Sequence, residues 1–151
     1  AYAECGLLHR LRGLFHLLQH PRLRHRVVRL RRRTDLHHLS GCPGADDFVG
    51  AAMTALNVTD TALLLINGQY GPEVGTQNHF RYTEKLGKPV IFLINQLDSE
   101  KCDFNQVLDN LIDIYGTKVV PIQYPLNEGP NFNSLIDVLL MKKYTWGPEA
   151  A

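Results

Sequence analysis

Two continuous apolar runs, at residues 62–66 and 90–94, restrict the fold of this chain more than any other feature. Neither run alternates apolar with polar residues, which is typical of a strand buried on both faces of a parallel sheet. Both are far shorter than the roughly 20 apolar residues that a membrane-spanning helix needs. We therefore expect two parallel strands, at residues 61–67 and 90–95.

Helical patterns alternate with these runs. We expect helices over residues 46–56, 72–86 and 103–115. A short apolar run at residues 119–122 is a third strand candidate. This order predicts an α/β domain with a parallel sheet and helices on both faces. The residues behind these assignments are the caps Asp46 and Asp103, the helix start Pro72, the stops Gly87 and Gly116, and the apolar stripe of Phe104, Val107, Leu108, Leu111 and Ile114.

Beyond Pro125 the pattern loosens. Residues 126–134 have the composition of a loop, and the apolar segment 135–144 does not distinguish a strand from a helix. The total length of 151 residues fits one domain.

Charge is distributed very unevenly, although the formal net charge is only +1. Residues 1–41 contain nine Arg, no Lys, six of the seven His and two acids, which gives +7. Residues 42–151 contain one Arg, six Lys and thirteen acids, which gives −6. A switch from Arg alone to nearly all Lys is unusual within one domain, so the first 41 residues need their own explanation.

The three cysteines, Cys5, Cys42 and Cys102, are widely spaced and form no CxxC motif. This pattern argues against a disulfide framework and a zinc site, and it favours a reducing compartment. The basic N-terminal residues also lack the continuous apolar stretch of a secretory signal. We expect a cytoplasmic protein without a metal-ligand cluster or a membrane partner.

The segment Asn95-Gln96-Leu97-Asp98 follows the second expected strand directly. Ligands of open parallel sheets bind at this carboxyl edge. The amide of Asn95 can pair with the acceptor edge of guanine, and the carboxylate of Asp98 can accept from its ring N–H and exocyclic amine. Adenine has no such pair of donors, so this arrangement would reject it. On its own the NxxD spacing is more typical of a polar loop that ends a strand.

Further segments in the same order resemble the GTP-binding domain of elongation factor G, a translational GTPase. The resemblance covers about residues 42–147, is continuous in order and spacing, and is nearest to Bacteroidetes-type members. Residues 119–125 resemble the start of an inserted subdomain of that family. The other segments that carry the resemblance are Cys42-Pro43-Gly44, Asp47-Phe48-Val49, Gly71-Pro72-Glu73, Gly87-Lys88-Pro89 and Leu135-Ile136-Asp137.

Carried over, the resemblance implies that Asn95 and Asp98 bind guanine. Gln96 replaces the family's usual Lys; because it is shorter and uncharged, it is expected to support the nucleotide less well. Pro43 and Gly44 fall in the phosphate-sensing switch motif, in which the backbone N–H of Gly44 would contact the γ-phosphate.

The chain also departs from this family. Gly41 stands where the family has the Asp that holds Mg²⁺ through water, and Ala45 where it has the His that orients the attacking water. No GxxxxGK[ST] motif occurs, so there is no phosphate loop. The family's ligands are GTP or GDP with Mg²⁺, and we expect weak or no binding of them here and no catalytic residue.

The first strand and the phosphate loop form the centre of a P-loop GTPase sheet, so the resemblance implies an incomplete sheet. We expect the two apolar strands to lack a neighbour, and unfolding to be poorly cooperative. A helix carrying Leu14, Leu17 and Leu18 could lie across the gap.

Residues 1–41 have three interpretations: a basic arm that binds RNA, an amphipathic membrane-surface helix, or an out-of-frame translation. The third is compatible with the genetic code. Shifted codons across residues 13–21 can encode Gly-Ser-Ser-Ile-Phe-Ser-Ser-Thr, which resembles the first switch of the family. On that interpretation the frame changes near Gly41, which replaces an encoded Asp.

Together these observations predict three segments: 1–41 out of frame, 42–125 a partial GTP-binding domain, and 126–151 the truncated start of an inserted subdomain. The chain would be an inactive fragment of an elongation factor G-like GTPase, whose parent works on the ribosome and meets nucleic acid only through it. Two alternatives remain: a non-enzymatic ribosome- or RNA-binding protein that uses the basic arm, and a GTPase-like domain that binds GTP but barely hydrolyses it.

Overall fold

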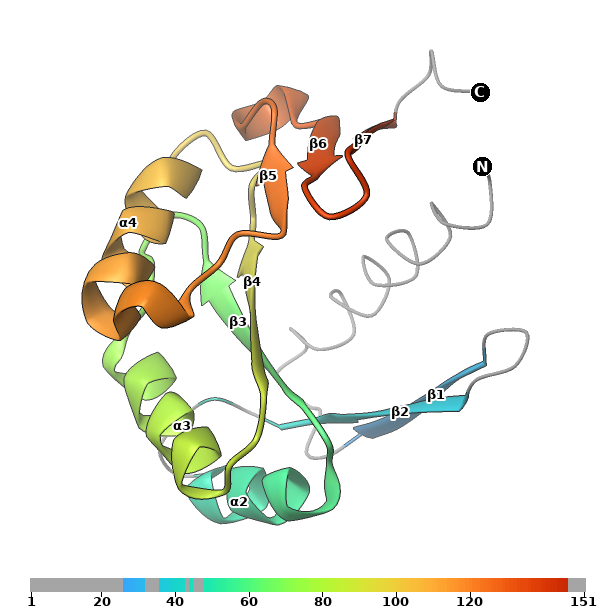
Figure 1. The fold of residues 1–151 in the computed structure, drawn as a ribbon, viewed down its shortest axis with the longest axis vertical. Helices are drawn as coiled ribbons and strands as arrows, with labels where there is room; N and C mark the ends of the chain where they lie inside the picture. Colours follow the sequence, from blue (N-terminus) through green and yellow to red (C-terminus); the bar gives the residue numbers. More distant parts are fainter. Residues whose placement is uncertain (1–25, 32–35, 43, 45–47, 147–151) are drawn as a thin grey trace.

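The structure, a computed structural model, describes residues 26–31, 36–42, 44 and 48–146. The expectations for Leu14, Leu17, Leu18, Pro43, Ala45 and Asp46 lie outside these residues. Within them, a pair of parallel strands is flanked by helices, with small antiparallel sheets beside it (Figure 1). No helix among these residues is long and apolar enough to cross a membrane.

The two apolar runs form the parallel pair, as predicted. Strand β3 (Ala62–Asn67) pairs with β4 (Val90–Asn95) in a register that sets Ala62 opposite Val90 and Asn67 opposite Asn95. Both strands therefore end at the same edge of the sheet, each with an asparagine.

Three helices lie where the sequence predicts them: α2 (Val49–Val58), α3 (Val74–Lys85) and α4 (Phe104–Tyr115). The Oδ1 atom of Asp103 accepts a hydrogen bond from the backbone N–H of Gln106, which confirms Asp103 as the cap of α4. Gly87 and Gly116 follow α3 and α4 with φ of 62° and 68°, a left-handed region that glycine enters without strain.

The core lies between the parallel pair and the helices α3 and α4, which stand on one side of it (Figure 1). Ile66 from β3 packs against Val107 and Leu111 of α4, and all three are at most 2% exposed. Phe92 and Ile94 of β4 complete this face. Within the described residues, the prediction of helices is confirmed for this face of the sheet. The prediction that Ile114 belongs to the buried stripe of α4 is wrong, because its side chain is 42% exposed.

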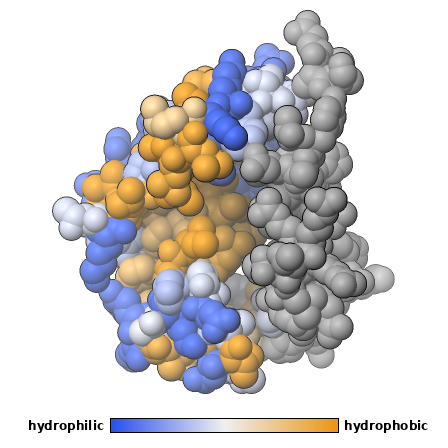
Figure 2. Space-filling view, turned by 45° about the vertical axis from the view of Figure 1, so that its right-hand side comes forward, coloured by the Kyte–Doolittle hydropathy of each residue, from blue (hydrophilic) through white to orange (hydrophobic). Residues whose placement is uncertain are grey.

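The opposite face of the parallel pair carries Leu65 and Ile91, which are 38% and 45% exposed. Strands β1 (Arg26–Arg31) and β2 (Leu36–Gly41) form a separate antiparallel hairpin, so β3 has β4 as its one sheet neighbour among the described strands. Hydrophobic residues gather around a hollow in the middle of the face drawn in Figure 2.

The predicted third strand at residues 119–122 is wrong. Val119 packs against the core, but Val120 and Ile122 are 71% and 44% exposed, and Pro121 has no N–H to give to a ladder. Of this apolar run, Val119 alone packs against the core. The connection that follows α4 is not part of the parallel sheet, which contains β3 and β4.

Beyond that connection the described chain forms a third sheet. Strands β5 (Gln123–Pro125), β6 (Ser134–Asp137) and β7 (Lys142–Thr145) pair antiparallel in that order. The segment 135–144, which the pattern left open, is mainly a β-hairpin, whose turn includes Met141 at φ 51°. The predicted loop at 126–134 contains a short 3-10 helix (Gly129–Asn131) and the first residue of β6.

Candidate functional site: the loop after strand β4

The loop that follows β4 begins with a left-handed residue. Gln96 has φ 63°, which only a few per cent of non-glycine residues adopt. Its carbonyl accepts a hydrogen bond from the N–H of Ser99 at 3.0 Å and closes a turn that contains Asp98. Asn95 is half-buried at the strand end, and Asp98 is exposed. The chain reversal thus presents both side chains of the predicted guanine pair on one short turn.

The side chain of Gln96 is held by the neighbouring strand. The Nδ2 atom of Asn67 donates to Oε1 of Gln96 at 2.8 Å, while Oδ1 of Asn67 accepts from the backbone N–H of Gln69 and Tyr70 at 2.7 and 3.3 Å. Asn67 therefore ties the loop after β4 to the turn after β3. Gln96, the one clear departure within this motif, has a definite partner.

Gly68 brings the two loops into close contact. Its N–H donates to the carbonyl of Asn95 at 2.8 Å, and its own carbonyl accepts from the N–H of Asp103 at 3.2 Å. A Cβ atom at Gly68 would lie 2.7 Å from that carbonyl of Asn95 and 2.9 Å from Sγ of Cys102. Because real Cβ contacts are not that short, any larger residue at position 68 has to displace the backbone that carries Asn95.

A second brace comes from the loop before β6. The N–H of Gly129 donates to the carbonyl of Leu97 at 2.8 Å, and the carboxylate of Glu128 accepts from the N–H of Phe104 at 3.0 Å. The turn that holds Asp98 is therefore fastened on both flanks. Burial, together with the Glu128 carboxylate, raises the pKa of the Cys102 thiol to about 11, so this half-buried thiol stays protonated at neutral pH.

The switch residues lie elsewhere. Gly44 is exposed, and its carbonyl oxygen would be 3.4 Å from a Cβ atom on Gly75, in the first turn of α3. Its neighbours Pro43 and Ala45 are outside the described residues. The structure thus brings Asn95, Gln96 and Asp98 together, and puts Gly44 beside a helix rather than within that turn.

The chemistry of these side chains can be compared with the groups of a guanine nucleotide. An amide and a carboxylate at a sheet edge match the hydrogen-bonding edge of the base, but the sequence contains no phosphate-binding loop. Across the part of the chain that the structure describes, no cluster of three His, Cys, Asp or Glu side chains could hold a metal ion. The residues present could therefore contact the base, without an evident partner for the phosphates.

The sequence reasoning missed Asn67, Gly68 and Glu128. An Asn-Gly pair at the end of a buried strand indicates a turn, and Gln96 in place of the usual Lys is the signal that a different partner is needed. Neither signal predicts that the turn and the loop touch, because that contact depends on the register of β3 against β4.

Comparisons with known proteins identify the family of this chain. The sequence model described as the elongation factor Tu GTP binding domain matches residues 24–145. The chain therefore belongs to the family of translational GTPases that contain this domain.

Individual relatives are similar over most of the chain. An "Elongation factor G" of Rhodopseudomonas palustris is 35% identical over 108 residues, and an "Elongation factor G-like protein" of Thermotoga maritima is 28% identical over 109 residues. Each match covers 72% of this chain and 16% of the relative, so the chain spans about one sixth of their length. A Thermus thermophilus protein of known crystal structure superposes with a TM-score of 0.75 and 34% identity, over 83% of this chain and 19% of that one.

Proposed function

We propose that this chain is part of the GTP-binding domain of an elongation factor G-like protein, and that its Asn95, Gln96 and Asp98 form the contact to guanine. The observation that carries this proposal is the braced turn after β4. Asn67 fixes Gln96, and Gly68 fixes the backbone of Asn95. Both restraints would hold the two side chains in place for a base.

The parent protein would couple GTP binding and hydrolysis to movement on the ribosome in the cytoplasm, with GTP or GDP and Mg²⁺ as its ligands. Contact with nucleic acid would be indirect, through the ribosome. We also propose, from the segments Cys42-Pro43-Gly44 and Asn95-Gln96-Leu97-Asp98 alone, a Bacteroidetes-type member, in which Gln96 replaces the usual Lys.

The chain itself should not hydrolyse GTP. Ala45 has no side chain that could orient a water molecule, Gly41 offers no carboxylate to Mg²⁺, and no phosphate loop occurs in the sequence. Pro43 and Gly44 retain part of the switch motif, but a backbone N–H alone cannot replace these groups.

The proposal is tested by titrating the purified chain with a fluorescent GDP, in parallel with Asn95→Ala and Asp98→Ala. We expect weak binding that both variants abolish, and no GTP turnover with Mg²⁺. Magnesium-dependent turnover would refute the inactive assignment. Binding that neither variant changes would refute the site.

The segment boundaries belong to the same proposal: residues 42–125 as the partial GTP-binding domain and 126–151 as the beginning of an inserted subdomain. For residues 1–41 we propose an out-of-frame translation, although the family match begins at residue 24. The genomic nucleotide sequence across residues 35–45 tests this directly. If the alternative frame upstream of Cys42 encodes no switch-like segment, the frame proposal is wrong.

A second candidate function rests on the charge of +7 in residues 1–41. If this arm binds RNA, deleting it should lower RNA affinity and flatten the salt dependence of binding. Unchanged affinity and salt slope would exclude it.

A third candidate, a domain that binds GTP but barely hydrolyses it, requires saturable GDP binding by the unaltered chain.

A further inference from the structure

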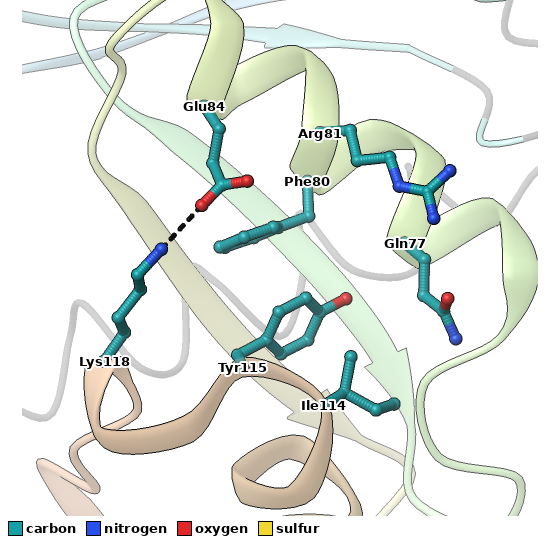
Figure 3. Close-up of a pocket in the computed structure, with 7 residues that line it drawn as sticks. All are labelled: Gln77, Phe80, Arg81, Glu84, Ile114, Tyr115 and Lys118. Carbon is teal, nitrogen blue, oxygen red and sulfur yellow. Dashed lines mark hydrogen bonds and ion pairs between the residues drawn. The ribbon is translucent and has the colours of Figure 1, made fainter.

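A cleft of about 420 Å³ lies between α3 and the C-terminal end of α4, apart from the loop after β4 (Figure 3). Its volume is in the range of small-molecule sites. It shares no residue with the candidate guanine site. Its lining consists of Gln77, Phe80, Arg81 and Glu84 from α3 and Ile114, Tyr115 and Lys118 from the end of α4 and the turn after it.

The floor of the cleft is aromatic. The rings of Phe80 and Tyr115 have centroids 4.2 Å apart, and both rings lie against Phe92 of β4, at 5.8 and 5.1 Å. Ile114 adds an aliphatic wall that is 42% exposed. An apolar group that entered the cleft would therefore be covered by rings on one side.

One polar atom in this floor lacks a partner. The hydroxyl of Tyr115 is buried and makes no hydrogen bond to any residue that the structure describes. A buried hydroxyl left unpaired is destabilising, so native proteins normally satisfy it with protein, water or ligand. In Figure 3 this hydroxyl points toward the side of the cleft where Arg81 and Gln77 stand.

The charges around the cleft are not balanced. Lys118 and Glu84 pair with each other at 2.8 Å on one side. Arg81, on the other side, forms no ion pair with any described residue and is exposed. The cleft therefore offers a guanidinium, a phenol hydroxyl and an amide as donors, above an apolar floor.

From this arrangement we propose that the α3–α4 cleft binds a small organic carboxylate with an apolar body. A carboxylate accepts two parallel hydrogen bonds from a guanidinium, and its remaining lone pairs can accept a hydrogen bond that the Tyr115 hydroxyl donates. The apolar body then lies over Phe80 and beside Ile114. A phosphate would satisfy Arg81 but would leave the aromatic floor uncovered.

The test is an NMR titration of the chain with benzoate as the probe, followed through the amide signals of α3 and α4. We expect saturable binding, no binding of the neutral isostere benzamide, and affinity at least about tenfold lower in Arg81→Gln and Tyr115→Phe. Lys85→Gln, an exposed cation on the same helix outside the cleft, serves as the matched control and should change little. Both test variants keep most of the side chain, and their spectra report directly whether the fold is intact.

Three outcomes overturn the proposal. Equal binding of benzamide would remove the role of the charge. Equal binding of inorganic phosphate would remove the role of the apolar body. Benzoate binding that is absent, or that Arg81→Gln and Tyr115→Phe leave unchanged while their spectra remain native, would remove the site itself.

Discussion

Gly68 is the residue on which the geometry of the candidate guanine site depends most directly. Replacing it with Ala would put a methyl group 2.7 Å from the carbonyl of Asn95. Backbone on one side and Cys102 on the other leave little room, so we expect Gly68→Ala to lower the free energy of unfolding by about 1–3 kcal/mol. Urea unfolding measures this, and the amide shifts of Asn95 and Gln96 should move as well.

Gly50→Ala is the matched control, because a Cβ at Gly50 in α2 would meet no atom within 4 Å. It should leave stability unchanged or raise it by up to about 1 kcal/mol. If Gly68→Ala changes the free energy of unfolding as little as Gly50→Ala does, the close contact between the two loops is contradicted.

Cys102 reports on the other brace of the loop. Burial raises its pKa to about 11, with contributions from the carboxylates of Glu128, Asp103 and Asp98. Because the folded pKa exceeds the unfolded value near 9, this thiol favours folding fully below pH 9 and loses that contribution between pH 9 and 11. Alkylation of Cys102 at pH 9 should therefore be slow in the folded chain.

Glu128→Gln removes one of these negative charges and keeps an oxygen that can accept from Phe104. We expect a lower pKa of Cys102 and faster alkylation at pH 9, followed by mass spectrometry of the Cys102 peptide. Glu100→Gln, in the loop that carries Cys102, is the control and should leave the alkylation rate unchanged. An identical rate in all three proteins would contradict the Glu128 contact.

At the scale of elements, the turn after β3 and the loop after β4 work as a unit through Asn67 and Gln96. Asn67→Asp loses the amide donor to Gln96 but keeps the oxygen that accepts from Gln69 and Tyr70. Gln96→Lys, which restores the family residue, loses the acceptor. Each single change should destabilise the loop, because one polar group loses its partner.

The double variant Asn67→Asp/Gln96→Lys should recover part of the loss, since a carboxylate then faces an ammonium. The pair is exposed, so the coupling free energy in a double-mutant cycle should be only about 0.5–1 kcal/mol. A cycle in which the two effects simply add would show that the two elements are not coupled through these side chains.

The elements also show how far the sequence alone reaches. The two parallel strands, the cap at Asp103 and the stop at Gly116 were predictable, because each depends on local signals. The strand predicted at residues 119–122 was wrong, because a short apolar run does not indicate whether another strand lies beside it. The Asn67–Gln96 bond depends on the pairing of segments far apart in the sequence, which periodicity does not encode. The β6–β7 hairpin is local, but its connection at residues 138–141 contains no Gly, Pro, Asn or Asp to indicate a turn.

At the scale of the whole molecule, β3 has one sheet neighbour among the described strands, and Leu65 and Ile91 are exposed, so we expect weakly cooperative unfolding. A two-stranded parallel sheet buries too little surface to unfold in one sharp step. We expect a broad thermal transition, and hydrogen exchange of β3 and β4 through local opening. Calorimetry and native-state exchange measure both; a sharp two-state transition with full protection of these strands would contradict this prediction.

The molecule combines a braced turn that can contact a base with a sequence that has no phosphate loop. With this combination, the phosphates of GTP add nothing to the free energy of binding. The most direct test compares the affinities of guanosine, GTP with Mg²⁺ and adenosine for the same chain. The account predicts weak binding of guanosine and GTP within about threefold of each other, and none of adenosine. GTP that binds about a hundredfold more tightly than guanosine, in a magnesium-dependent way, would contradict it.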